Sequence, residues 1–412
     1  MRKTKKSKNN VKLQQINLIL YILLLIMTPF LLLQNYLQAA IGVASNASFT
    51  VAGHSIPYTV LIALILLLTA FILLRKRIRL YHILLTTGVL LLFWIGQQLT
   101  DFYFNHKFYE LQHNWHYLAY SGFAILSWRY GLSKGKTSAQ IILYTLVFAF
   151  SVSLLDEIAQ VPLSNRVFDI CDIAKDIYGA VIGNVFIFYV LEEGKNIPKK
   201  LQLTHPKLKD YFNNPLTLLV YEYLFVLIFL SITSILSMSE YFLIAFPLPV
   251  IVFIVIWFAI HLLQYKTSKI LVTGLTGLMI VAGLTSFAIH SKKNITYNRY
   301  GITIYKGIPI PYLDIMIYEN GTWRIVDKKH EFNVRDQRTI LKYATDILLI
   351  GSGSDGLGGK GFPGNEPVQF IFNPNTGKMT QVIILRTPQA CKLYNIMKKE
   401  NKNVTFILHN TC

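Results

Sequence analysis

Acidic side chains gather in residues 156–184 of this 412-residue chain, DEIAQVPLSNRVFDICDIAKDIYGAVIGN, beside runs of apolar residues. The five acids are Asp156, Glu157, Asp169, Asp172 and Asp176. Paired carboxylates can act as general acids and bases or bind substrate hydroxyl groups. An acidic side chain inside a membrane is costly and usually faces a bundle interior or a wet cavity. The segment therefore predicts a functional cavity at the ends of membrane helices.

The spacing of these residues predicts how they are arranged. Asp156 and Gln160 are one helical turn apart. Three acids and two glycines share one face if 169–190 is a single helix: Asp169, Asp172, Asp176, Gly179 and Gly183. Glycines at this spacing let a neighbouring helix approach closely. A second interpretation is structural: the deeper acids pair with Arg166 and Lys175 and lock the helices together, while the others are solvated loop residues.

The functional interpretation gives each polar residue a role. Asp156 or Glu157 acts as the general base or as the ligand of a substrate hydroxyl. Asp172 and Asp176 orient the bound group, and Arg166 binds an anionic head group. These roles make the segment a candidate catalytic and substrate-binding site.

Further candidates lie earlier in the chain. His116 and Tyr120 are one turn apart and, with Gln160, are candidate substrate-binding residues. A histidine at the end of a span is also a common interfacial anchor. His113 and His116 lack a third ligand at a regular spacing, and the three cysteines lack paired CxxC spacing. We therefore predict neither a metal nor a cofactor.

The elements that must position these residues are membrane helices. The chain is 53% hydrophobic and only 15% charged, which excludes an average soluble protein. About twenty apolar residues span a bilayer. Nine segments qualify: 16–38 (with Pro29 as a tolerated kink), 58–74, 80–99, 116–133, 138–155, 174–192, 216–237, 241–263 and 269–289.

Basic residues predict the orientation of these spans. Lys and Arg cluster in the N-terminal tail and in every second connection, and they are almost absent from the connections between. The positive-inside rule then places the N-terminus in the cytoplasm and residues 157–173 outside. Nine spans place the segment after residue 290 outside as well. The net charge of +19 is thus explained by topology, and no nucleic-acid partner is predicted.

The last part of the chain has the composition of a small soluble domain. GITIYKG, LDIMIYENGTWRIVD, DILLI, QVIIL and NVTFILH read as strands, with a tight hairpin turn at Asn320–Gly321. Thr387 and Pro388 look like the N-cap and first position of a helix, PQACKLYNIMKKE. GSGSDGLGGKGFPGNEP contains GxGxxG but does not open a helix, so we predict a flexible or strained surface loop. Cys391 and Cys412 are predicted to be free thiols.

The segment 80–193 resembles the VanZ-like family, small membrane proteins named after a teicoplanin-resistance factor. The resemblance rests on HNWHYLAYSGFAILSW and on a signature of eight polar or glycine positions: Asp156, Glu157, Gln160, Arg166, Asp172, Asp176, Gly179 and Gly183. The family often has a histidine between the acidic pair and the glutamine, where this chain has Ala159. The resemblance implies a role in the cell envelope and an effect on glycopeptide susceptibility.

The segment 297–412 resembles a small α/β family of unknown function that includes a mitochondrial complex I assembly factor. The residues that carry this are YGITIYKGIPIPYLDIMI, TWRIVDKKHEFN, DILLIGSG and LRTPQACKLYNIMKKENKNVTFIL. The resemblance implies a fold and no activity. Its members are usually soluble intracellular proteins, whereas the topology above places this segment outside.

We therefore predict an α-helical polytopic membrane protein with about nine transmembrane helices and a small C-terminal α/β soluble domain. Its parts are a basic tail with two spans (1–79), a VanZ-like four-helix unit (80–193), a cytoplasmic loop with three spans (194–290) and the α/β domain (295–412).

The predicted role is in the cytoplasmic (inner) membrane, where the protein binds or modifies a polar or lipid-linked, anionic envelope component. One alternative is a scaffold or assembly factor whose C-terminal domain binds a protein partner. Another is a proton-coupled transporter in which Asp172 and Asp176 relay protons.

Overall fold

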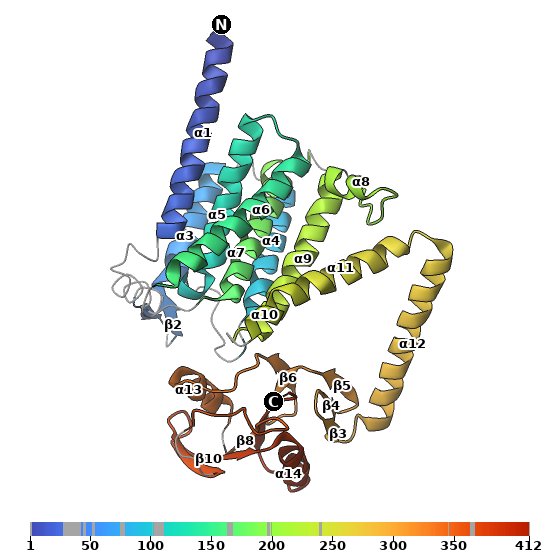
Figure 1. The fold of residues 1–412 in the computed structure, drawn as a ribbon. Coiled ribbons are helices and arrows are strands. Elements are labelled where there is room, and N and C mark those ends of the chain that lie inside the picture. Colours follow the sequence, from blue (N-terminus) through green and yellow to red (C-terminus); the bar gives the residue numbers. More distant parts are fainter. Residues whose placement is uncertain are drawn as a thin grey trace. The chain divides into compact units, whose positions relative to one another are not determined.

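The chain folds into long helices followed by a β-rich region (Figure 1). The structure is a computed structural model. It describes residues 2–27, 43, 47–51, 54–74, 79–100, 102, 111–162, 168–195, 198, 200–238, 241–344, 346–362 and 367–411. Seven of the described helices are long and apolar enough to cross a membrane, which indicates a multi-pass membrane protein.

Helices lie at each of the nine segments that the sequence predicts. They are α1 (Arg2–Met27), α3 (Tyr58–Leu74), α4 (Leu80–Thr100), α5 (Leu111–Ser133), α6 (Ser138–Gln160), α7 (Ile170–Val185) continuing as the π-helix η1 (Phe186–Leu191), α9 (Pro215–Ile235), α10 (Phe242–Ala245) with α11 (Pro247–Leu262), and α12 (Lys266–His290). Two of them, α3 and α5, fall outside the seven candidate spans. The first helix begins earlier than predicted, and Pro29 lies outside the described residues.

Shorter elements connect the long helices. A hairpin of β1 (Ser48–Val51) and β2 (His54–Pro57) precedes α3, and α8 (Leu208–Asn213) precedes α9. The described residues form two compact units. The helical unit contains α1 to α11 apart from Ile235 at the end of α9, and the C-terminal unit contains Ile235–Met238, α12 and all that follows α12. The sequence analysis grouped residues 266–290 with the preceding spans instead.

Local sequence explains where the two central helices begin. Thr137 and Gln140 form a capping box at the start of α6. Asp169 caps α7, because its Oδ1 accepts a hydrogen bond from the Cys171 amide at 2.7 Å. The prediction that Asp169 shares the helical face with Asp172 and Asp176 is therefore wrong, since Asp169 precedes the helix that carries the other two.

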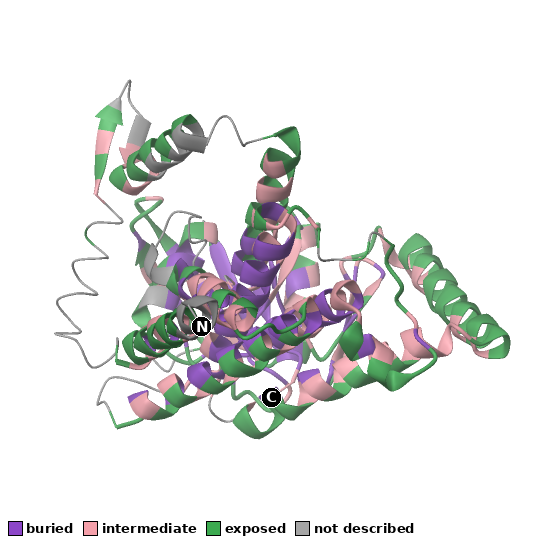
Figure 2. Cartoon of the chain, turned by 90° about the horizontal axis from the view of Figure 1, so that it is seen from above, coloured by how far each residue is buried: buried purple, intermediate pink, exposed green. Residues whose placement is uncertain are grey.

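Close packing surrounds α7, which is the most deeply buried of the candidate spans. A Cβ at Gly179 would lie 2.7 Å from the Tyr117 carbonyl oxygen, and one at Gly183 would lie 2.9 Å from the Ser121 carbonyl oxygen. Only glycine lets α5 and α7 approach this closely, as the sequence predicts. Figure 2 shows that residues between the packed helices are buried, whereas many residues on their outer faces are exposed. Helix α12 has no buried residue along its length.

A mixed six-stranded sheet forms the centre of the C-terminal unit, in the order β7-β6-β11-β8-β10-β9. Its strands are β6 (Asp314–Ile317), β7 (Trp323–Val326), β8 (Ile347–Gly351), β9 (Val368–Asn373), β10 (Lys378–Leu385) and β11 (Val404–Leu408). β8 pairs in parallel with both β10 and β11, and the other pairs are antiparallel. A smaller antiparallel sheet contains β3 (Ile295–Arg299), β4 (Ile302–Tyr305) and β5 (Ile308–Pro311).

Two helices accompany the large sheet. On β8, Leu349 belongs to the same hydrophobic cluster as Tyr394 of α14 (Thr387–Lys399). The preceding residue, Leu348, belongs to a second hydrophobic cluster, which contains Ile340 of α13 (Val334–Tyr343). Because successive side chains of a strand point to opposite faces, α13 and α14 cover opposite faces of the sheet.

The strands predicted in this region are confirmed, and so is the hairpin turn, where Gly321 has φ +77°. The sequence analysis missed β3, β5, β9 and α13. It also predicted the wrong N-cap for α14, because Arg386 occupies that position and Thr387 is already helical.

Candidate functional site

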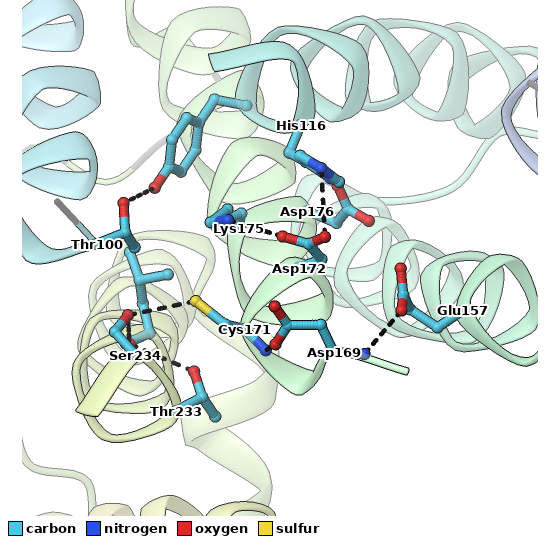
Figure 3. A network of polar contacts seen from close by, with 12 residues as sticks. Thr100, His116, Glu157, Asp169, Cys171, Asp172, Lys175, Asp176, Thr233 and Ser234 are labelled. Carbon is cyan, nitrogen blue, oxygen red and sulfur yellow. Dashed lines mark hydrogen bonds and ion pairs between the residues drawn. The ribbon is translucent and has the colours of Figure 1, made fainter. Parts of the chain in front are cut away.

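A histidine and an aspartate from different helices lie at the centre of the candidate site. His116 of α5 and Asp176 of α7 place Nδ1 and Oδ1 2.9 Å apart (Figure 3). Ser153 of α6 donates a hydrogen bond to the other carboxylate oxygen of Asp176 at 2.6 Å. The Asp176 side chain is 3% exposed and that of His116 is 25% exposed. The Asp176 carboxylate is thus buried between the helices, whereas the His116 imidazole is partly accessible to solvent.

A second carboxylate lies beside the other ring nitrogen. Asp172 Oδ2 is 3.7 Å from His116 Nε2, which is too far for a hydrogen bond and close enough for an ion pair. Asp172 Oδ1 accepts a hydrogen bond from Lys175 Nζ at 2.7 Å. The predicted pairing of Asp172 with Lys175 is therefore present, one turn along the same helix.

Two candidate residues stabilise the connection between α6 and α7. Glu157 Oε2 accepts a hydrogen bond from the Asp169 amide at 2.9 Å, and Glu157 Oε1 accepts one from Gln160 Nε2 at 3.2 Å. Glu157 is 3% exposed and Gln160 is 7% exposed. Both oxygens of Glu157 are thus occupied, which favours a structural role for it.

Two further candidates lie at the edge of the His116–Asp176 pair. Tyr120 is one turn beyond His116 on α5 and is 3% exposed. The Oδ1 atom of Asp156 is buried and has no hydrogen-bond partner among the described residues. Arg166 lies outside the described residues, so the structure does not place it.

The structure thus brings seven of the eight predicted residues onto three helices, α5, α6 and α7. The site contains five acidic residues and two basic groups, Lys175 and the ionisable ring of His116. An acidic cluster of this composition suits a proton, a hydroxyl group or a cation better than an anion. Among the residues that the structure describes, no group of three His, Cys, Asp or Glu side chains is placed to hold a metal ion.

Ser153 and Glu222 are not among the residues predicted from the sequence. Ser153 could have been found from its spacing, because it lies one turn before Asp156 on the same helix. Glu222 of α9 is 4% exposed, and neither of its carboxyl oxygens has a hydrogen-bond partner within the described part of the chain. A lone acidic residue in an apolar helix was itself the available signal.

Comparison with known proteins gives little further information. No family model matches the chain, and no curated protein matches it. A solved structure named "MT938" is 22% identical, with 29% of this chain and 98% of that chain covered and a TM-score of 0.23. A likeness at this level carries no argument about fold or function.

Proposed function

We propose that the chain is a VanZ-like integral protein of the cytoplasmic membrane whose His116–Asp176 pair acts on a polar or lipid-linked component of the cell envelope. The observation that carries this proposal is the orientation of His116. One ring nitrogen is held by a buried carboxylate, and the other faces Asp172 across a gap of 3.7 Å. This is the arrangement of an acid–base histidine.

The chemistry follows from the hydrogen bonds of Asp176. An ionised carboxylate only accepts, so His116 donates its Nδ1–H to Asp176 and presents Nε2 as a lone pair while the ring is neutral. Nε2 can then take a proton from a substrate hydroxyl group. The resulting imidazolium is stabilised by Asp176 on one side and by Asp172 on the other.

The excess of acidic groups around His116 limits the class of substrate that the site can bind. Because acids outnumber bases around His116, the bound group is a hydroxyl of a neutral or weakly polar head group. Binding of an anionic head group would depend on Arg166. The proposed topology, with a cytoplasmic N-terminus and a small α/β domain after the last span, places the site at the outer face of the membrane.

A scaffold role is the second candidate, and two observations favour it. The glycine contacts between α5 and α7 and the closure of the α6–α7 connection by Glu157 both stabilise helix packing. In this role the polar cluster fixes the helices, and the C-terminal unit binds a protein partner.

Proton-coupled transport is a third candidate. Asp176 and Glu222 are both buried acids of membrane helices, and Glu222 has no hydrogen-bond partner among the described residues. A transporter could bind and release protons at such groups.

The first experiment tests the acid–base role with His116→Gln and Asp176→Asn. Each variant is expressed in a deletion strain, and teicoplanin susceptibility and the amount of protein in the membrane are measured together. We expect normal membrane levels and loss of complementation, because loss of a general acid or base lowers a rate about 10²- to 10⁴-fold. His82→Gln is the matched control, since His82 forms a different carboxylate pair with Glu193.

The same assay separates the alternatives. Normal complementation by both variants would overturn the acid–base proposal. If Gly179→Ala abolishes function while Asp176→Asn retains it, the scaffold role is correct. Proton-coupled uptake into vesicles that Glu222→Gln abolishes would identify a transporter.

A further inference from the structure

A glycine-rich segment of the C-terminal unit lies where three parallel strands end. We call residues 352–362 the glycine loop. In the register of the sheet, Gly351 of β8 is level with Leu385 of β10 and with Leu408 of β11, so all three strands end together. Ligands of sheets with parallel strands commonly bind beyond such carboxyl ends.

The glycine loop, which the sequence predicts to be a flexible or strained surface loop, is partly buried. Ser352, Gly353, Gly358 and Gly359 are buried, whereas residues 355–357 and 360–361 are exposed. The Gly358 amide donates a hydrogen bond to the Ser352 carbonyl oxygen at 3.0 Å. The loop is therefore folded back over the ends of the strands, and part of it remains on the surface.

Its glycines are required by the backbone. Gly353, Gly356, Gly359 and Gly361 have φ between +82° and +99°, a region that other residues rarely adopt. Gly358 is required by space, because a Cβ there would lie 2.9 Å from Cδ2 of His409. The loop is thus shaped to lie directly on the imidazole ring of His409.

His409 follows β11 and forms a fully buried pair with Asp314 of β6. His409 Nδ1 and Asp314 Oδ2 are 2.8 Å apart, and both side chains are 0% exposed. Asp314 Oδ1 also accepts hydrogen bonds from Lys328 Nζ at 3.1 Å and from the Asn410 amide at 2.8 Å. Burial acts to raise the pKa of Asp314, but the hydrogen bond from His409 and the charge of Lys328 outweigh it, so this pKa lies below its ordinary value.

The other ring nitrogen of His409 has no such partner. Nε2 is buried and makes no hydrogen bond to any residue that the structure describes. A buried polar atom without a partner is rare in proteins, because its desolvation is not compensated. This Nε2 atom belongs to the His409 ring, which the glycine loop covers.

The charges around His409 define what this nitrogen can bind. An ionised Asp314 cannot donate, so His409 donates through Nδ1, which leaves the lone pair of a neutral ring on Nε2. Lys328 is paired with Asp314 and balances its charge. The nitrogen therefore suits an uncharged group with a hydrogen-bond donor.

An anion site at the nearby start of α14 is excluded by its hydrogen bonds. The Thr387 amide donates to the Gly353 carbonyl oxygen, and the Gln389 and Ala390 amides donate to that of Arg386. Pro388 has no amide hydrogen. No donor of the first helical turn is thus left for a phosphate.

We propose that His409 and the glycine loop form a binding site for a neutral, hydroxyl-bearing small molecule, and that the loop opens to admit it. The bound hydroxyl donates to His409 Nε2, and the loop closes over it through Gly358. The site lies within the C-terminal unit and is independent of the function proposed for His116.

Chemical labelling of the full-length protein in detergent tests this site. Diethyl pyrocarbonate acylates neutral imidazole nitrogens, and mass spectrometry follows the peptide that carries His409. We expect His409 to react, and glycerol to slow its reaction by a factor of 1 + [glycerol]/Kd, about tenfold at ten times Kd. Inorganic phosphate tests for an anion, and betaine tests for an osmolyte effect, since it stabilises compact states without a hydroxyl group.

Each outcome decides the proposal. Protection of His409 by glycerol alone supports it. Complete inertness of His409 while other histidines react, equal protection by betaine, or protection by phosphate instead of glycerol would each overturn it.

Two loop variants sharpen the test. In Gly358→Ala the added methyl group takes the space beside the ring, so glycerol protection should be lost. Leu357→Ala, at an exposed neighbouring position, should retain it. Glycerol protection that survives in a folded Gly358→Ala protein would contradict the placement of the ligand under the loop. If that variant does not fold, the wild-type labelling still decides.

Discussion

Two histidine–aspartate pairs of nearly the same local geometry occur in the two units. Nδ1 lies 2.9 Å from Asp176 in His116 and 2.8 Å from Asp314 in His409. The pairs differ at the second ring nitrogen. That of His116 faces Asp172 and belongs to a partly exposed ring, whereas that of His409 is fully buried without a hydrogen-bond partner among the described residues.

The aspartates differ as well. Asp176 accepts from two side chains that carry no fixed charge, His116 and Ser153. Asp314 accepts from a buried lysine, a backbone amide and His409. The same pair can therefore serve proton transfer where a second carboxylate stabilises the imidazolium, and neutral binding where a lysine already balances the charge.

The largest expected stability difference comes from removing each carboxylate in turn. Asp314→Asn leaves the buried charge of Lys328 unpaired, which should cost about 3–5 kcal/mol of unfolding free energy in the C-terminal unit. Asp176→Asn should cost only about 1 kcal/mol in the helical unit, because hydrogen bonds between membrane helices contribute about 0.6 kcal/mol on average.

Buried cysteines report on the two units separately. Cys171 lies in α7 and Cys391 in α14, and both are free thiols. Burial raises the pKa of Cys391 to about 12, so this thiol reacts only when its unit opens. Thiol labelling across a denaturant series, in a Cys412→Ser background, measures both unfolding free energies. Equal losses in the two variants would show that Lys328 does not distinguish the pairs.

A smaller effect is expected from Asp327, which lies in the same unit as Asp314. Burial raises its pKa to about 6, and the nearby charge of Lys329 only partly opposes this. Because the folded-state pKa lies above the unfolded value of about 3.9, the ionised carboxyl costs stability above pH 6, and this cost disappears as the pH falls toward 4.

Asp327→Asn should therefore stabilise the C-terminal unit at pH 7, by about 1–3 kcal/mol. Labelling of Cys391 at pH 7 and pH 4.5 measures it, and the gain should shrink at the lower pH. Asp346→Asn is the control, since Asp346 is exposed. A destabilised Asp327→Asn protein at pH 7 would show that its carboxylate is needed by Lys329.

Sequence spacing predicted much of the membrane site. The positions of the helices followed from apolar length, and the contacts of Gly179 and Gly183 followed from helical period. His116 and Asp176 are 60 positions apart in the chain. Local spacing therefore identified each residue as a candidate but could not predict that the two form a pair. Asp169 was misplaced because a capping aspartate and a helical one have the same spacing from Asp172.

The C-terminal site was beyond the reach of sequence spacing. Asp314 and His409 are 95 positions apart; Asp314 begins β6, and His409 directly follows β11. The glycines were visible, but the reason for them was not, because it depends on the His409 ring beneath Gly358. Local patterns reveal periodic faces, whereas the meeting of strand ends is decided by the topology of the sheet.

The smallest expected effect concerns Ser153. Its substitution tests whether Asp176 orients His116 or only stabilises helix packing. Ser153→Ala removes one of two hydrogen bonds to this carboxylate and should cost about 0.6 kcal/mol of helical-unit stability. If Asp176 orients an acid–base histidine, the loss of this donor also makes the carboxylate a stronger partner for His116. The pH profile of activity should then shift upward, because the imidazolium is stabilised. Ser151→Ala, which alters an exposed serine of the same helix, should shift neither quantity. A stability loss without a shifted profile would mean that Asp176 serves packing alone.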